Sequence, residues 1–104
     1  MTIQINTDKN VQVHEAFETQ LDDLLSEELS RFSEHITRLE VHLSDENGNK
    51  KGQDDKRCMI EARLEGRQPI AVTANANDYE LAVSDAIEKL KSSLDTIEGR
   101  LKNH

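Results

Sequence analysis

Strict alternation of polar and apolar residues through the middle of the chain is the feature that most limits its fold. Residues 37–44, 56–65 and 70–75 each place an apolar side chain at every second position. This is the period of a β-strand with one covered face. A polar loop with an Asn-Gly turn signal, DENGNKKGQDD, follows the first run, and the link GRQP follows the second. The three runs therefore predict an antiparallel meander with one apolar face.

Two further elements precede this meander. Residues 2–6, TIQIN, alternate polar and apolar and predict a short strand with Ile3 and Ile5 on one face. Residues 14–33 repeat apolar side chains at close to 3.6-residue spacing, which predicts one amphipathic helix. Glu28 is the one polar interruption of that apolar stripe. The outer face of this helix is strongly acidic.

A second amphipathic helix closes the chain. Asn77 and Glu80 stand three residues apart, as in a capping box that opens a helix. The apolar stripe that follows consists of Val83, Ile87, Leu90, Leu94, Ile97 and Leu101. Its spacings of three and four residues predict a helix buried against the sheet or the first helix.

The expected order of elements is therefore β-α-β-β-β-α, within a single α+β domain over residues 1–104. Alternating strands need only one covered face. We expect a four-stranded, mostly antiparallel sheet with both helices packed on one face. The other sheet face should be polar and open.

Charge is distributed unevenly over the chain. The net charge is −8, which argues against binding phosphate over the whole surface. Residues 1–47 hold 11 acidic and 3 basic residues, whereas residues 48–104 hold 10 of each. One side of the protein should repel phosphate, while another could accept it.

The sequence offers no candidate for catalysis. The four histidines do not fall at metal-ligand spacing, and the single cysteine, Cys58, lies on the inward face of a predicted strand. Glycine-rich phosphate loops and a nucleophile elbow are absent from the sequence. We expect no enzyme, no cofactor, no metal and no small-molecule substrate. We expect no signal peptide and no membrane-spanning segment, and we expect a cytoplasmic location.

Three segments stand out beside the order of elements: NVQVHEAF (10–17), ANDYELAVSDAIEKL (76–90) and RLKNH (100–104). Together with that order, they resemble the ribosome hibernation factors. This family includes the hibernation-promoting factor and the ribosome-associated inhibitor (factor Y), also called sigma-54 modulation proteins. The resemblance implies a non-enzymatic stress factor that binds the small ribosomal subunit and inhibits translation by idle ribosomes. Ribosomal RNA would be the main contact, with ribosomal proteins as a further option.

The resemblance also implies where RNA would bind. The expected RNA-binding residues are Lys89, Arg100 and Lys102, which fall where the last helix of the family is basic, helped by Lys91 and Arg57. Ser92, Thr96 and Glu98 stand where typical members carry further bases. The sequence leaves open the exact ribosomal site and the oligomeric state.

A second hypothesis starts from the acidic helix. Typical members of the family have a mixed or basic first helix, whereas residues 14–34 here carry a local excess of acid. The chain would then be a diverged member that has lost RNA binding. Its acidic helix would serve as a protein-interaction module for a basic partner.

Overall fold

The computed structural model describes residues 1–8, 11, 14–45 and 55–102, and for residues 98–102 it describes the backbone alone. The elements are β1 (Thr2–Thr7), α1 (Glu15–Glu28), a 3₁₀ turn η1 (Ser30–Phe32), β2 (Ile36–Asp45), β3 (Lys56–Leu64), β4 (Ile70–Ala76) and α2 (Tyr79–Lys102). This confirms the predicted α+β order. The predicted polar loop lies mostly outside the described residues.

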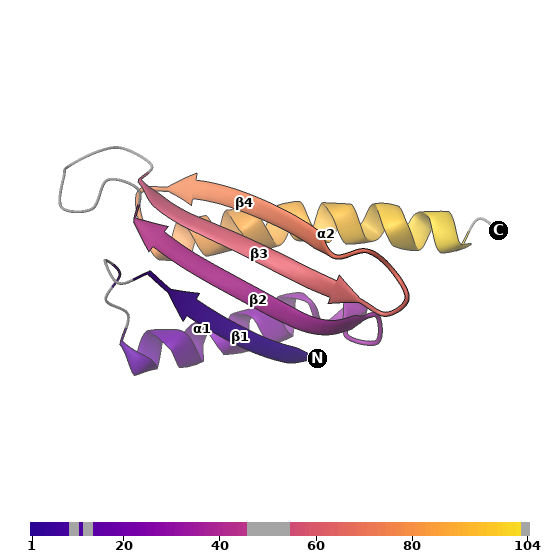
Figure 1. The fold of residues 1–104 in the computed structure, drawn as a ribbon, viewed down its shortest axis with the longest axis horizontal. Coiled ribbons are helices and arrows are strands. Elements are labelled where there is room, and N and C mark those ends of the chain that lie inside the picture. Colours follow the sequence, from indigo (N-terminus) through magenta and orange to yellow (C-terminus); the bar gives the residue numbers. More distant parts are fainter. Residues whose placement is uncertain (9–10, 12–13, 46–54, 103–104) are drawn as a thin grey trace.

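The four strands form one mixed sheet in the order β1-β2-β3-β4 (Figure 1). β2, β3 and β4 pair antiparallel, which confirms the predicted meander. β1 pairs parallel with β2, so that Ile3 lies opposite Leu39 and Ile5 opposite Val41. A parallel pair needs a crossover connection, and α1 lies within that connection.

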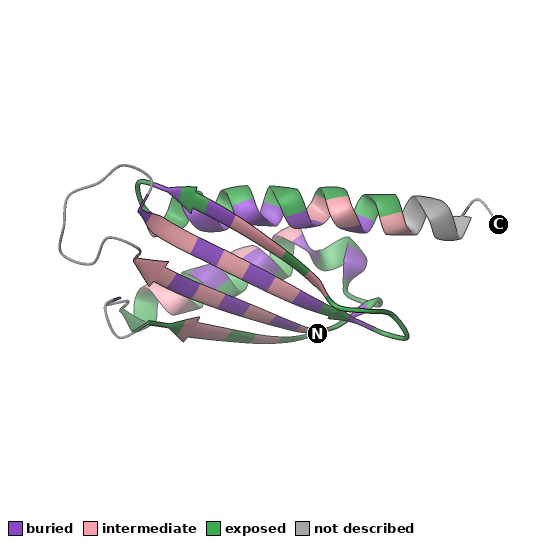
Figure 2. Ribbon diagram, turned by 45° about the horizontal axis from the view of Figure 1, so that its top comes forward, coloured by how far each residue is buried: buried purple, intermediate pink, exposed green. Residues whose placement is uncertain are grey.

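Both helices cover the same face of the sheet, as expected (Figure 1). α2 packs against β3 and β4. The inward side chains of the strands are buried beneath the helices, among them Val41, Ile60 and Ala62. Figure 2 shows this alternation as bands of buried residues along β2 and β3. The core therefore lies between one sheet face and two helices, and the other face stays open.

The first helix is shorter than predicted. The α-helix ends at Glu28, and a 3₁₀ turn over Ser30–Phe32 replaces the rest of the predicted helix. Leu29 leaves helical geometry, with φ of −105° and ψ of 13°. Leu29 and Phe32 are both buried. The tighter turn places residues three apart on the same side, which directs both side chains into the core.

The second helix is capped one residue later than predicted. The Asp78 carboxylate accepts a hydrogen bond of 2.8 Å from the Leu81 backbone N–H. This is the geometry of an N-cap residue at position 78, so the predicted box of Asn77 and Glu80 is wrong. Asn77 and Asp78 are both good capping residues, and the sequence pattern alone did not separate them.

Candidate nucleic-acid interface

The five predicted RNA-binding residues lie on two elements. Lys89, Lys91, Arg100 and Lys102 belong to α2, whereas Arg57 belongs to β3. The side chains of Arg100 and Lys102 lie outside the described part of the structure. α2 runs for 24 residues, and its last turns extend beyond the end of the sheet (Figure 1).

Lys89 lies at the edge of the sheet formed by β4. Its Nζ donates a hydrogen bond of 2.7 Å to the backbone carbonyl of Thr73. Within the described residues it has no carboxylate partner, and the side chain is exposed. A lysine bound only to a carbonyl keeps its full charge available to an anion. Lys89 therefore presents an exposed charge without a carboxylate partner among the described residues.

Lys91 points away from that edge, toward α1. Its Nζ lies 3.0 Å from Glu28 Oε2 and 3.6 Å from Glu88 Oε1. The hydrogen bond with Glu28 is the main cause of the raised pKa of Lys91. Positions two apart on a helix point in nearly opposite directions, so Lys89 and Lys91 do not form one basic stripe. The contact also explains Glu28, the polar interruption of the first helix.

Arg57 is half-buried on the open face of the sheet. Its cross-strand neighbours are Ser44 on β2 and Asn75 on β4. Lys89 reaches Thr73, two positions before Asn75 on the same strand. Lys89 therefore lies at the β4 edge of the sheet, whereas Arg57 lies one strand further in, on the open face.

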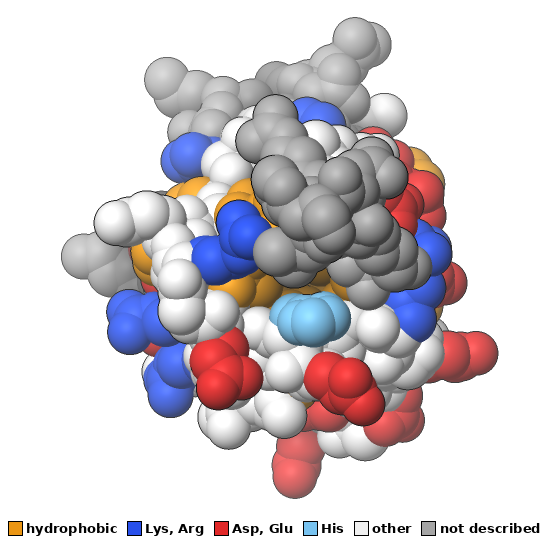
Figure 3. All heavy atoms as spheres, turned by 90° about the vertical axis from the view of Figure 1, so that its right-hand side faces the viewer, with side chains coloured by type: hydrophobic (Ala, Val, Ile, Leu, Met, Phe, Trp, Pro, Cys, Tyr) orange, Lys and Arg blue, Asp and Glu red, His pale blue; other side chains and the backbone are white. Residues whose placement is uncertain are grey.

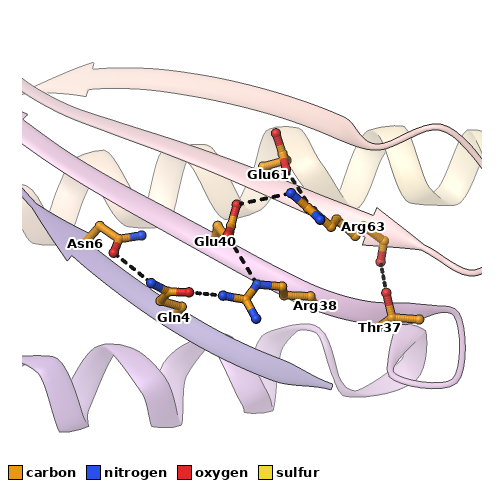
Figure 4. Close-up of polar contacts among 7 residues, drawn as sticks. All are labelled: Gln4, Asn6, Thr37, Arg38, Glu40, Glu61 and Arg63. Carbon is orange, nitrogen blue, oxygen red and sulfur yellow. Dashed lines mark hydrogen bonds and ion pairs between the residues drawn. The ribbon is translucent and has the colours of Figure 1, made fainter.

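Two other basic side chains on the open sheet face, Arg38 and Arg63, form ion pairs with glutamates (Figure 4). Arg38 Nε lies 3.2 Å from Glu40, and Arg63 Nε lies 3.2 Å from Glu61. Arg63 also lies 3.9 Å from Glu40, and Gln4 accepts a hydrogen bond from Arg38. Exposed pairs of this kind contribute little stability, but they balance the charge of the face. The middle of the open face is therefore polar and close to neutral.

Lys56 has a structural role at the end of the sheet where β2 ends and β3 begins. Its Nζ lies 2.8 Å from Asp45 and 3.2 Å from Asp55, two side chains that are more than nine-tenths buried. It also lies 5.8 Å from the centre of the Tyr79 ring, at the start of α2. The hydrogen bond with Asp45 is the main cause of the raised pKa of Lys56. This group ties β2 and β3 to the beginning of α2.

Arg67 is a basic residue that the sequence reasoning missed. It lies exposed in the turn between β3 and β4, and no ion pair joins it to another described residue. A hollow of about 210 Å³ separates Arg67 from Leu94 and Ile97 of α2. Arg100 follows Ile97 by three residues on the same helix. The charge of the turn was visible in GRQP, but its place beside α2 was not.

Among the side chains that the structure describes, the surface seen from this end carries no continuous patch of one charge (Figure 3). Their Lys and Arg side chains are interspersed with Asp and Glu around exposed apolar atoms. On this described part of the surface, a ligand held through phosphates would meet separate basic side chains.

The described residues contain no group of three or more His, Cys, Asp or Glu side chains that could hold a metal ion. None of their helices is long and apolar enough to cross a membrane.

The fold defines a small α+β protein with an open sheet face, and the exposed Lys89 of its last helix lies at the β4 edge. The chain belongs to the family described as sigma 54 modulation protein / S30EA ribosomal protein, whose family model matches residues 3–102. This confirms the resemblance to the ribosome-associated hibernation factors. Comparison with curated proteins yields no match.

Two solved structures share the fold. One is the crystal structure of the N-terminal domain of Protein Y from Thermus thermophilus, with 21% identity and a TM-score of 0.73 over 93% of this chain and 99% of that one. The other is a ribosomal subunit interface protein from Coxiella burnetii, with 20% identity and a TM-score of 0.72 over 95% and 99%. At this level of identity, the likeness establishes the fold.

Proposed function

We propose that this protein is a cytoplasmic ribosome-associated factor that binds the small ribosomal subunit and inhibits translation by idle ribosomes. Its membership of the family over residues 3–102 carries the proposal. The description of the Coxiella burnetii protein as a ribosomal subunit interface protein supports it. The proposal includes no catalysis and no cofactor.

The proposed contacts are electrostatic. Lys89, Arg100 and Lys102 would meet phosphates of ribosomal RNA, with Arg57 and Lys91 as weaker contributors. Lys89 supports this assignment because it keeps its charge unpaired at an exposed edge. Arg67 joins the set because its turn lies beside Ile97, just before Arg100.

Lys91 should contribute least among these residues. Moving its ammonium group to a phosphate would break the contact with Glu28 that joins α1 to α2. The gain from a new phosphate contact would therefore be offset by the loss of an internal one.

The test is co-sedimentation with purified small subunits at low salt, using matched variants. Neutralising Lys89→Gln, Arg100→Gln and Lys102→Gln together should weaken binding about tenfold or more. The control neutralises Arg31, Arg38 and Arg63 to Gln, three bases already paired with carboxylates. It has the same net charge as the test variant and should bind like the wild type. Equal losses in the two variants would refute the site assignment.

A cell-free translation assay tests the second half of the proposal. The wild-type protein should reduce translation. The triple variant of Lys89, Arg100 and Lys102 should reduce it less, in proportion to its loss of subunit binding. A protein that binds subunits tightly without changing translation would contradict the inhibitory role.

A further inference from the structure

A groove with one acidic wall runs between β1 and α1. It encloses about 430 Å³ and is lined by Ile3, Ile5, Glu15, Glu18, Thr19, Asp22 and Asp23. Ile3 and Ile5 come from the helix-facing side of β1 and are only half-buried. The groove thus has two apolar side chains from an edge strand and a wall of carboxylates from a helix.

The carboxylates of this wall have no ion-pair partner in the part of the chain that the structure describes. Within the described residues, none of Glu15, Glu18, Asp22 and Asp23 forms an ion pair, and α1 itself contains no base. Some acidic residues elsewhere are paired, as Glu28 is with Lys91 and Glu40 is with Arg38. Like charges three or four positions apart on a helix oppose its folding. The wall therefore carries an unbalanced charge that a cationic partner would neutralise.

β1 provides a second, independent feature. It is an edge strand of the described sheet, so the backbone groups on its outer side have no partner among the described strands. Its sequence, TIQINT, contains no lysine and no proline, the residues that usually block such an edge. The opposite edge strand, β4, has Lys89 bound to its Thr73 carbonyl and α2 alongside it. β1 is thus the less protected edge.

The two features face the same space. A strand added beside β1 would direct every second side chain to the helix side of the sheet, beside Ile3 and Ile5. Those side chains would lie against the carboxylates of α1. Five strand residues span about 13 Å, and the helix from Glu15 to Asp23 rises about 12 Å. Three alternate side chains could therefore meet the full length of the wall.

We propose that this groove binds a basic, extended segment of a partner protein by β-strand addition to β1. The segment would carry Lys or Arg at alternate positions. Their aliphatic stems would pack on Ile3 and Ile5, and their charged ends would meet the carboxylates of α1. RNA is a poor occupant because its phosphates would face the acidic wall. A second copy is also disfavoured, since β1 has no base and the net charge is −8.

This inference is independent of the proposed ribosome function. The groove lies at the β1 edge of the sheet, whereas Lys89 lies at the β4 edge. The experiment therefore uses the full chain and a peptide, with no ribosomes. Failure of either proposal leaves the other standing.

The probe is a fluorescein-labelled peptide of about seven residues, with Lys at the odd positions and Thr at the even ones. Binding is followed by fluorescence anisotropy. The comparison peptide has the same sequence with every backbone amide N-methylated, which keeps the charge but removes the N–H groups that a strand needs. The first peptide should bind about tenfold more tightly than the second. Equal affinities would overturn strand addition, and so would an absence of binding at low salt.

Matched variants then locate the site. Glu18→Gln with Asp22→Asn should weaken binding of the lysine–threonine peptide about tenfold. The control, Glu27→Gln with Glu80→Gln, removes the same charge from exposed residues outside the groove and should bind like the wild type. Equal weakening in both variants would show general attraction of the peptide to an acidic protein. It would overturn the assignment of binding to the groove. A short RNA oligonucleotide that binds the groove better than the peptide would also overturn it.

Discussion

At the scale of single residues, Cys58 shows how burial sets chemistry. The thiol lies fully inside the core, between Leu43 and Ala74 on the neighbouring strands. Burial raises its pKa from 9.0 to about 12. The side chain therefore behaves as a small buried hydrophobe, as the alternation of its strand predicted.

The raised pKa of Cys58 predicts a loss of stability in alkali. The unfolded chain loses the thiol proton above pH 9.0, whereas the folded protein retains it up to about pH 12. The free energy of unfolding should therefore fall through this window, by up to about 1.4 kcal/mol per pH unit from this group. Urea unfolding of the wild type and Cys58→Ala at several pH values measures the difference. Parallel pH profiles for the two proteins would contradict the prediction.

The ion pair of Lys91 with Glu28 predicts coupling between the helices. Because the pKa of Lys91 is raised, its stabilising effect is present below the ordinary value of 10.5 and is lost as pH rises through the folded value. Lys91→Gln and Glu28→Gln should each lower the melting temperature modestly. The double variant should melt close to the single ones. Fully additive losses near neutral pH would mean that the pair does not join α1 and α2.

At the scale of elements, the turn between β3 and β4 depends on one glycine. Gly66 has a φ of +71°, in the left-handed region that other residues enter at a cost. A Cβ added there would meet nothing within 4 Å, so the cost of substitution is in the backbone. Gly66→Ala should lower the free energy of unfolding by about 1–2 kcal/mol, measured by urea unfolding. Gly66→Asn should cost less, and the opposite ranking would contradict this account.

The start of α2 depends on Asp78. Asp78→Ala removes the acceptor of the Leu81 N–H and should cost about 1 kcal/mol of stability. Asp78→Asn keeps a side-chain oxygen at the same place and should recover most of that loss. Thermal unfolding of the two variants gives the comparison. An alanine variant as stable as the wild type would assign the cap to another residue.

Local patterns predicted the elements well and their ends less well. The alternation in β2, β3 and β4 depends on neighbouring residues only, so it was readable from the sequence. The end of α1 was not readable from the sequence. Leu29 and Phe32 fit the apolar stripe of a longer helix equally well, and only their packing in the core distinguishes the two conformations. The cap of α2 was missed by one residue for a similar reason, since Asn77 and Asp78 are both good caps.

The candidate interface was harder to predict, because its geometry comes from contacts between distant parts of the chain. Lys91 and Glu28 are 63 residues apart, and the sequence around each residue gives no signal that the two form an ion pair. Lys89 and Lys91 looked alike in the sequence, yet one reaches β4 and the other α1. Arg67 becomes interesting only because its turn packs beside Ile97. Residue type was readable from the sequence, but availability to a ligand was not.

At the scale of the whole molecule, the two edges of the sheet differ in the exposed charge that they present. The unpaired carboxylates of α1 lie by the β1 edge, whereas Lys89 lies by the β4 edge. Such a separation orients a protein as it approaches a charged partner. An RNA surface should therefore meet the edge formed by β4 and α2, and α1 should face away from the phosphates. The acidic groove would then remain free for a basic protein segment.

The most direct test of the central claim is the salt dependence of binding to purified small ribosomal subunits. Three or four basic contacts predict that the logarithm of the binding constant falls against the logarithm of salt concentration with a slope of about −2 to −4. That result would support a family member that still binds RNA through a small number of Lys and Arg side chains. Binding that is absent at low salt, or that does not change with salt, would contradict the account.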